Sequence, residues 1–342
     1  MRLGPQRHLW IYYSHHVVGD LFSGQLVWRR VQHRYRQLLE NQTQNIPPGP
    51  PPGRLAQREQ NYLLRSDRVA RDREFWESRF PPQLGFRLSP PTPAGDTLRH
   101  LIEQRWVVPQ DRWRRFTALA ASLHVTPTQA MMAVLTAYLG RLLGEDEIIL
   151  AAPVHNRLGA IDRETFDLFV NMLPLRLVLT SETSFEELAR SAANETHLGL
   201  RHRQYPIGQL LAQQPNHGGI PGMPFTLSVS MASIDLGGSF GPAQHSVALF
   251  LGRPMLSPVA VYIYAYKDAL DIPIDFVVDP RALPALTDPE FLNARLDNLL
   301  DASPTPRSGC LIPVACPAPP ACPENSVSAA PVSAWAISSG RS

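Results

Sequence analysis

The apolar residues of this chain recur at two spacings, one typical of amphipathic helices and one typical of half-buried strands. The helical spacing predicts a helix at residues 22–40 and a charged helix or helix pair at 56–79. Further helices are predicted at 110–123, 126–143, 184–200 and 288–301. Short alternating or continuous apolar runs predict strands at 8–15, 99–108, 147–154, 172–179, 225–230, 247–251, 259–266 and 272–278.

Proline, glycine and capping residues mark where these elements begin and end. The sequence TPTQ at 126–129 offers an N-cap, a proline at the first helical position and a glutamine for reciprocal capping. The proline-rich run at 46–53 cannot lie inside a helix and predicts a stiff connector. Loops are expected at 90–95 and 214–222.

Helices and strands are interleaved throughout, which predicts an α/β or α+β fold with mixed sheets. At 342 residues the chain is long enough for two lobes and a sizeable core. From residue 303 onward it consists mostly of proline, alanine, serine and cysteine, which bury too little apolar area to offset chain entropy. We therefore expect a disordered tail at 303–342.

The overall composition argues against several classes of function. Charged residues make up 18% of the chain, and a net charge of +2 gives no reason to expect a nucleic-acid partner. Cys310, Cys316 and Cys322 all lie in the tail, where neither a disulfide framework nor a zinc site is expected. No apolar run has membrane-spanning length, and the first residues lack the apolar core of a signal peptide. The expectation is a cytoplasmic protein without a membrane partner.

Two adjacent histidines in the segment WIYYSHHVVGDLFS, residues 10–23, are the first candidates for chemistry. If His15 and His16 end the predicted strand, their rings point to opposite faces, so a shared metal ion is not expected. One imidazole would face a cavity and act as a base near neutral pH, and the other would pack behind it. Asp20 would brace the following turn through backbone bonds or an arginine. A structural histidine pair and a solvated or N-capping Asp20 are the ordinary alternatives.

The segment HHVVGD at 15–20 resembles the HHxxxDG signature of nonribosomal peptide synthetase condensation domains, within the chloramphenicol-acetyltransferase-like superfamily. Four later segments resemble motifs of that family in the same order, and the similarity covers roughly the first 300 residues. They are EQNYLLRSDRVARDREFW at 59–76, PVHNR at 153–157, FDLFVNMLPLR at 166–176 and HRQYP at 202–206.

The chain also departs from the family pattern. Leu21 stands where the signature has glycine, so the turn after Asp20 is expected to differ in shape. Asp167 stands where the FVN motif has glycine. The histidine motif begins at residue 15, whereas in the family it lies well inside the domain, so we expect an N-terminally truncated member. The expected division is a remainder of the N-terminal lobe at 1–95, a C-terminal lobe at 96–302 and the tail.

The resemblance implies a two-lobed fold with a tunnel between the lobes. Two carrier proteins would deliver substrates tethered as thioesters to phosphopantetheine, and an amine on one would attack the thioester carbonyl on the other. No metal or cofactor is expected on this chain itself, because phosphopantetheine arrives on the acyl or peptidyl carrier proteins. Other synthetase modules are the further expected partners.

The resemblance also implies roles for individual residues. His16 would be the catalytic residue, and Asp20 would be braced by an arginine that the family usually supplies from a segment before the motif. Arg157 is the candidate for that role in this chain. The implied site residues are His16, His15 and Asp20 for catalysis, with Asn171, Arg157 and Arg176 lining the tunnel or supporting it.

Two other functions stay open on the sequence alone. One is an inactive truncated fragment or a remnant that docks carrier proteins, favoured by the early histidine motif and by Leu21. The other is a stand-alone acyltransferase of the same superfamily that forms esters, because HHxxxD is shared and no synthetase neighbour is attached. The remaining histidines, His155, His197 and His202, are expected to be surface or packing residues.

Overall fold

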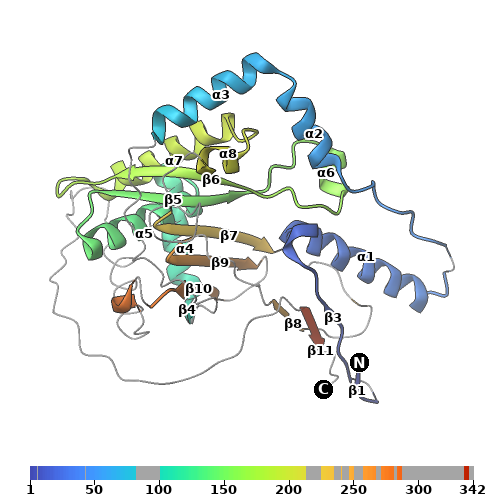
Figure 1. The fold of residues 1–342 in the computed structure, drawn as a ribbon. Coiled ribbons are helices and arrows are strands. Elements are labelled where there is room, and N and C mark those ends of the chain that lie inside the picture. The colour runs from blue at the N-terminus through green and yellow to red at the C-terminus, as the bar shows by residue number, and fades with distance from the viewer. Residues whose placement is uncertain are drawn as a thin grey trace, which may run out of the picture.

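A six-stranded mixed sheet forms the centre of the structure (Figure 1). The computed structural model describes residues 1–5, 7–42, 44–81, 101–212, 225–234, 240, 246–249, 257–266, 271–280, 283–286 and 335–338. The strands of the sheet are β4 (Ile102–Val108), β5 (Glu147–Val154), β6 (Asn171–Val178), β7 (Leu227–Ile234), β9 (Val259–Tyr266) and β10 (Ile272–Val278). Their order across the sheet is β4-β10-β9-β7-β5-β6.

Parallel and antiparallel pairs both occur in this sheet. β7 runs parallel to β5 and to β9, and the outer pairs on either side are antiparallel. β5 is a continuous apolar run whose middle is buried, as expected for a strand covered on both faces. The edge strand β4 alternates between exposed and buried side chains, with Trp106 and Val108 buried. The predicted mixed α/β architecture is confirmed.

Three long helices pack on the sheet or on one another. They are α4 (Gln110–Ser122), α5 (Pro127–Leu143) and α7 (Phe185–Arg201). α5 contacts β5 and β7, α7 contacts β6, and α4 contacts α5. The predicted capping box at the start of α5 is confirmed, since Thr126 and Gln129 form both reciprocal hydrogen bonds. No single described helix has the length and apolarity to cross a membrane; α4 and α5, bent by 99°, reach that threshold only as a pair.

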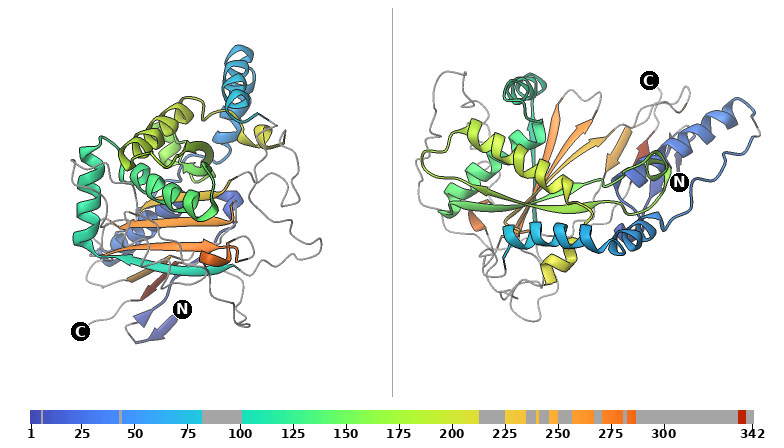
Figure 2. Two further views of the ribbon diagram at one scale, coloured as in Figure 1. Left: turned by 90° about the vertical axis from the view of Figure 1, so that its left-hand side faces the viewer. Right: turned by 90° about the horizontal axis from the view of Figure 1, so that it is seen from above.

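The N-terminal part adds three more helices, α1 (Leu21–Leu39), α2 (Arg54–Leu63) and α3 (Ser66–Arg79). Both figures show α1 beyond one end of the central strands (Figures 1 and 2). The short strands β1 (Arg2–Gly4) and β2 (Arg7–His8) pair with each other. β3 (Ile11–Tyr12), β8 (Ser246–Leu249) and β11 (Trp335–Ser338) form a small sheet in the order β3-β11-β8.

The predicted strand at 8–15 is wrong over most of its length. Only β2 and β3 form there, and β3 pairs with β11 over just two residues. The segment keeps strand-forming residues, but without a partner beyond Tyr12 it cannot form a ladder. His15 and His16 therefore follow the strand, and the argument that their rings point to opposite faces of one strand does not apply.

The other predicted elements inside the described ranges are confirmed within a few residues, and the connector at 46–53 has no regular structure. Two short helices, α6 (Ala160–Glu164) and α8 (Ile207–Ala212), were not predicted. The predicted helix at 288–301 and the predicted loops at 90–95 and 214–222 lie outside the described residues. So does the predicted tail at 303–342, except for the four residues of β11. The division into lobes at 1–95 and 96–302 stays a prediction.

Candidate functional site

The two histidines lie in a turn directly before α1. His16 begins a single 3-10 turn, η1 (His16–Val18), and His15 is its N-cap. The Nδ1 atom of His15 accepts a hydrogen bond of 3.1 Å from the backbone N–H of Val17. Both imidazoles are exposed, and within the described residues the His16 ring has no hydrogen-bond partner. His15 thus stabilises the turn, whereas the ring of His16 is open to an incoming molecule.

Asp20 holds the end of this turn by accepting hydrogen bonds from three donors. Its Oδ1 accepts from the backbone N–H of Ser23 at 2.9 Å, which caps α1, and from Arg157 Nη2 at 2.8 Å. Its Oδ2 accepts from the backbone N–H of Phe169 at 3.0 Å. The side chain is only 7% exposed, so the charge is buried but fully hydrogen-bonded. The predicted pair between Asp20 and Arg157 is present.

Arg157 gathers several segments of the chain around one fully buried guanidinium group. Besides binding the carboxylate described above, its Nη2 donates to Ser23 Oγ and to the carbonyl of Asp167, each at 3.0 Å. Its Nη1 donates to the carbonyls of Asp162 and Thr165, the latter at 2.8 Å. The cation therefore joins the first turn of α1 to α6 and to the loop that leads into β6.

Two aromatic rings cover this guanidinium group. The Cζ atom of Arg157 lies 4.6 Å from the ring centroid of Phe22 and 4.3 Å from that of Phe169. Such contacts exclude water and add a cation–π attraction of about 2 kcal/mol when the pair is desolvated. Because Phe22 belongs to α1 and Phe169 to the FVN segment, the rings reinforce the link made by the ion pair.

Gly19 lets the histidine turn approach the loop before β6 closely. A Cβ atom at this position would lie 3.0 Å from the Phe166 ring and 3.1 Å from the Cβ atom of Ser23. The backbone of Gly19 is extended, with φ of −175°, so the position requires space and not a left-handed conformation. Any larger residue would push Phe166 away from the turn.

Leu21, which stands where the family signature has glycine, is the first residue of α1. A helical position suits leucine better than glycine, and the expected difference in the shape of the turn stays a prediction. We predict that Leu21→Gly lowers the free energy of unfolding by about 0.5–1 kcal/mol, measured by urea denaturation. An increase in stability would show instead that the turn prefers glycine.

Asp167, the second departure from the pattern, holds the proline-rich connector in place. Its Oδ2 accepts a hydrogen bond of 2.8 Å from the backbone N–H of Gly53, at the end of the connector. Its carbonyl oxygen accepts one of 2.7 Å from Ser23 Oγ in α1. A glycine here could make only the second contact. The aspartate therefore ties the connector and α2 to the histidine turn.

Asn171 and Arg176 lie on β6 and bind partners outside this cluster. Asn171 donates from Nδ2 to the carbonyl of Arg203 at 2.8 Å. Arg176 forms a bidentate pair with Glu147 on β5, with distances of 2.6 and 2.8 Å. This pairing raises the pKa of Arg176 further above its ordinary value. The fold thus pairs Asp20 with Arg157 directly after the histidine turn, whereas Asn171 and Arg176 have other partners.

We predict that Arg176→Gln lowers the free energy of unfolding by less than about 1 kcal/mol, because the pair with Glu147 is partly exposed and screened by water. Urea denaturation of the variant against the wild type measures this. If Arg176 acts on substrate, catalytic activity will fall much more than stability, and the structural interpretation is then wrong.

His202 and His155 have structural surroundings, whereas His197 is exposed. His202 places Nδ1 2.7 Å from Asp72, which also accepts a hydrogen bond of 2.7 Å from the Tyr62 hydroxyl. This buried cluster connects α2, α3 and the end of α7, and burial together with Asp72 raises the pKa of Tyr62. His155 accepts a hydrogen bond from the backbone N–H of Arg157 at 3.2 Å. No group of three or more potential ligand side chains within the described ranges could hold a metal ion.

Sequence reasoning missed three residues of the site, Gly19, Phe22 and Ser23. The sequence did contain a signal for Ser23. It follows Asp20 by three positions, and the backbone N–H at that position commonly donates a hydrogen bond to an N-cap side chain. The contact of Ser23 with Asp167 had no signal, since it joins residues 144 positions apart. The space requirement at Gly19 and the ring contact of Phe22 likewise depend on the tertiary fold.

Comparison with known protein families and sequences gives a consistent result. The model of one family, described as the condensation domain, matches residues 1–224. The isonitrile lipopeptide synthase of Streptomyces coeruleorubidus is 35% identical over 222 residues, which are 61% of this chain and 14% of that protein. The dimodular nonribosomal peptide synthase of Bacillus subtilis (strain 168) is 24% identical over 281 residues, 81% of this chain and 12% of that protein. The chain therefore spans only a small part of the length of these relatives.

Solved structures share the fold. The first condensation domain of the CDA synthetase superposes with a TM-score of 0.65 at 21% identity, covering 87% of this chain and 63% of that one. This similarity confirms the predicted chloramphenicol-acetyltransferase-like fold. Because folds host many functions, the chemistry has to be argued from the histidine turn and its supports.

Proposed function

The chain belongs to the condensation domain family, and on that premise we propose that it transfers an acyl or peptidyl group from a thioester to an amine. The product is an amide, formed as a step of nonribosomal peptide biosynthesis. The observation that carries the proposal is the contrast within the histidine pair. His15 is committed to the turn through Val17, whereas His16 is exposed on a turn that Asp20 and Arg157 hold rigidly.

The reaction requires proton transfer at two atoms, the attacking nitrogen and the departing sulfur. The amine nitrogen attacks the thioester carbonyl carbon, a C–N bond forms, and the C–S bond breaks as the tetrahedral intermediate collapses. The nitrogen loses a proton and the departing sulfur gains one. A neutral His16 ring either accepts the proton from nitrogen or holds the amine and steadies the developing charge. A positioned base typically contributes a factor of about 10²–10⁴ in rate.

We propose acyl or peptidyl carrier proteins as the partners, with phosphopantetheine as the tether, and other synthetase modules as neighbours. Two sequence relatives are named as peptide or lipopeptide synthases, which supports this choice. Tethering supplies proximity, which complements proton transfer by an exposed imidazole. The net charge of +2 gives no reason to add a nucleic acid, no membrane partner is proposed, and the proposed location is the cytoplasm.

A reconstituted assay tests the proposal. A donor carrier protein loaded with an acyl thioester is mixed with the chain and with one of two acceptors of equal size, an amine or an alcohol. Mass spectrometry of the products is expected to show the amide with the amine acceptor and little ester with the alcohol. Preferential ester formation would identify an ester-forming acyltransferase of the same superfamily. Carrier binding without any product would identify a docking remnant.

A further inference from the structure

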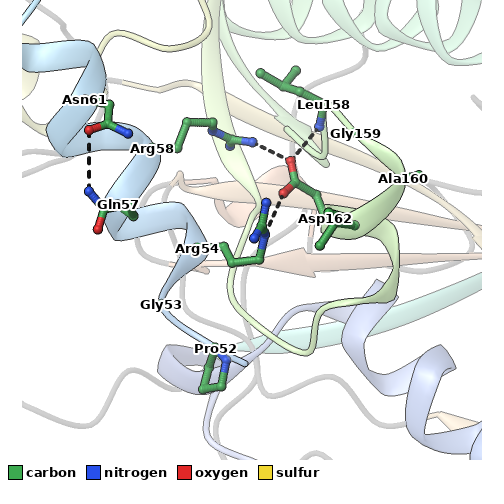
Figure 3. A pocket seen from close by; sticks show the side chains of 11 residues that line it. Pro52, Gly53, Arg54, Gln57, Arg58, Asn61, Leu158, Gly159, Ala160 and Asp162 are labelled. Atoms are coloured by element: carbon green, nitrogen blue, oxygen red, sulfur yellow. Dashed lines mark hydrogen bonds and ion pairs between the residues drawn. The ribbon is translucent and has the colours of Figure 1, made fainter. Parts of the chain in front are cut away.

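A pocket of about 820 Å³ opens between α2 and the segment that leads into α6 (Figure 3). One wall is the face of α2 that carries Arg54, Gln57, Arg58 and Asn61. The opposite wall consists of residues 158–162. Figure 3 shows both arginine side chains reaching from α2 towards Asp162. His16 does not line this pocket, so the pocket is a separate feature of the surface.

The charges that line the pocket do not cancel, because two guanidinium groups face one carboxylate. Arg58 is committed to the protein: it donates to Asp162 Oδ2 and to the carbonyl of Asn156, each at 2.8 Å. The Nε atom of Arg54 lies 3.5 Å from Asp162 Oδ1, and the Arg54 side chain is 41% exposed. Its Nη groups donate no hydrogen bond in the part of the chain that the structure describes. One positive charge with a free, fork-shaped donor is thus available to an anion.

Apolar side chains lie across the pocket from that cation. Leu158 is 42% exposed and Ile161 is 51% exposed, and both line the pocket. A ligand that suits both walls has an anionic group beside a branched apolar group. Phosphopantetheine has this arrangement, since one methylene separates its phosphate ester from a carbon that bears two methyl groups.

We propose that Arg54 binds the phosphate of a phosphopantetheine arm while Leu158 and Ile161 contact its dimethyl carbon. The choice of this phosphate ester rests on the proposed function. Hydrogen bonds also connect the pocket to α1, which follows the histidine turn. The backbone N–H of Gly53, at the rim of the pocket, donates to the Asp167 carboxylate, and the Asp167 carbonyl accepts a hydrogen bond from Ser23 Oγ in α1. An arm held here is therefore held by the same rigid unit that positions the turn.

Isothermal titration calorimetry with phosphopantetheine and with pantetheine, which lacks the phosphate, tests the proposal without any turnover. The wild type is expected to bind phosphopantetheine about tenfold more tightly than pantetheine, the effect of one charge-assisted contact. Arg54→Gln should abolish this preference, because the amide keeps polarity but has no charge. Arg115→Gln, an exposed arginine paired with Asp111 on α4, is the matched control and should keep the preference.

Three results would overturn the proposal. They are equal affinity of the wild type for both compounds, an unchanged preference in Arg54→Gln, and binding of inorganic phosphate as tight as that of phosphopantetheine. The last result would identify a site for free phosphate. An active condensing enzyme without a phosphate preference would contradict this inference alone. A chain that prefers phosphopantetheine but forms no amide would contradict the proposed function alone.

Discussion

Replacing His16 with alanine is expected to lower the rate of amide formation about 10²–10⁴-fold, the usual contribution of a positioned base. The His16 ring is exposed and makes no hydrogen bond within the described residues, so its removal should leave the fold intact. The measurement is single-turnover amide formation with loaded donor and acceptor carrier proteins. Circular dichroism and urea denaturation of the variant are expected to match the wild type.

The matched control for this variant is His33→Ala. His33 is also exposed but lies in the middle of α1, away from the histidine turn, so its loss should not change the rate. Equal turnover by the wild type and by His16→Ala would refute the role of His16 in the mechanism. A rate loss of similar size in His33→Ala would show that exposed histidines matter for some other reason, such as binding of the carrier proteins.

Replacing Arg157 with leucine is expected to lower the free energy of unfolding by about 3–5 kcal/mol, the typical cost of removing one partner of a buried ion pair. Leucine leaves the Asp20 carboxylate buried without its cation, leaves the carbonyl of Thr165 without its donor, and removes one of the two donors to the carbonyl of Asp167. It also removes the charge between two aromatic rings. Urea denaturation followed by circular dichroism measures the loss.

Arg163→Leu is the control for Arg157→Leu, because Arg163 is exposed and its loss should change stability by less than about 0.5 kcal/mol. A double variant that adds Asp20→Asn tests the coupling. It should be less unstable than the sum of the single changes, since a neutral amide is easier to bury without a cation. A loss below about 1 kcal/mol in Arg157→Leu would contradict the view that this residue organises the site.

The elements with strong local signals could be predicted from the sequence. The capping box at Thr126 and the apolar run of β5 are both specified within a few neighbouring residues, and both are confirmed. The strand predicted at 8–15 failed because its stability depends on a partner strand, which the local pattern does not report. The short helix α6 has only five residues, too few to show a clear period.

The same distinction applies to the candidate site. The pairing of Asp20 with Arg157 could be proposed because family motifs marked both residues before any contact was known. For Arg176, its cross-strand partner Glu147 depends on how β5 and β6 are aligned, which no motif in the sequence encodes. A motif therefore identified residues, whereas their contacts required the tertiary structure.

The long separation in sequence between the partners of Arg157 has a consequence for how the protein forms. Asp20 and Arg157 are 137 positions apart, and Asp20 and Phe169 are 149 apart. Such contacts form only after a large loop has closed, and they therefore come late in folding. On the ribosome, the histidine turn cannot acquire its brace until the segment around residue 169 has emerged. The brace of the histidine turn therefore forms only after about the first half of the chain has been synthesised.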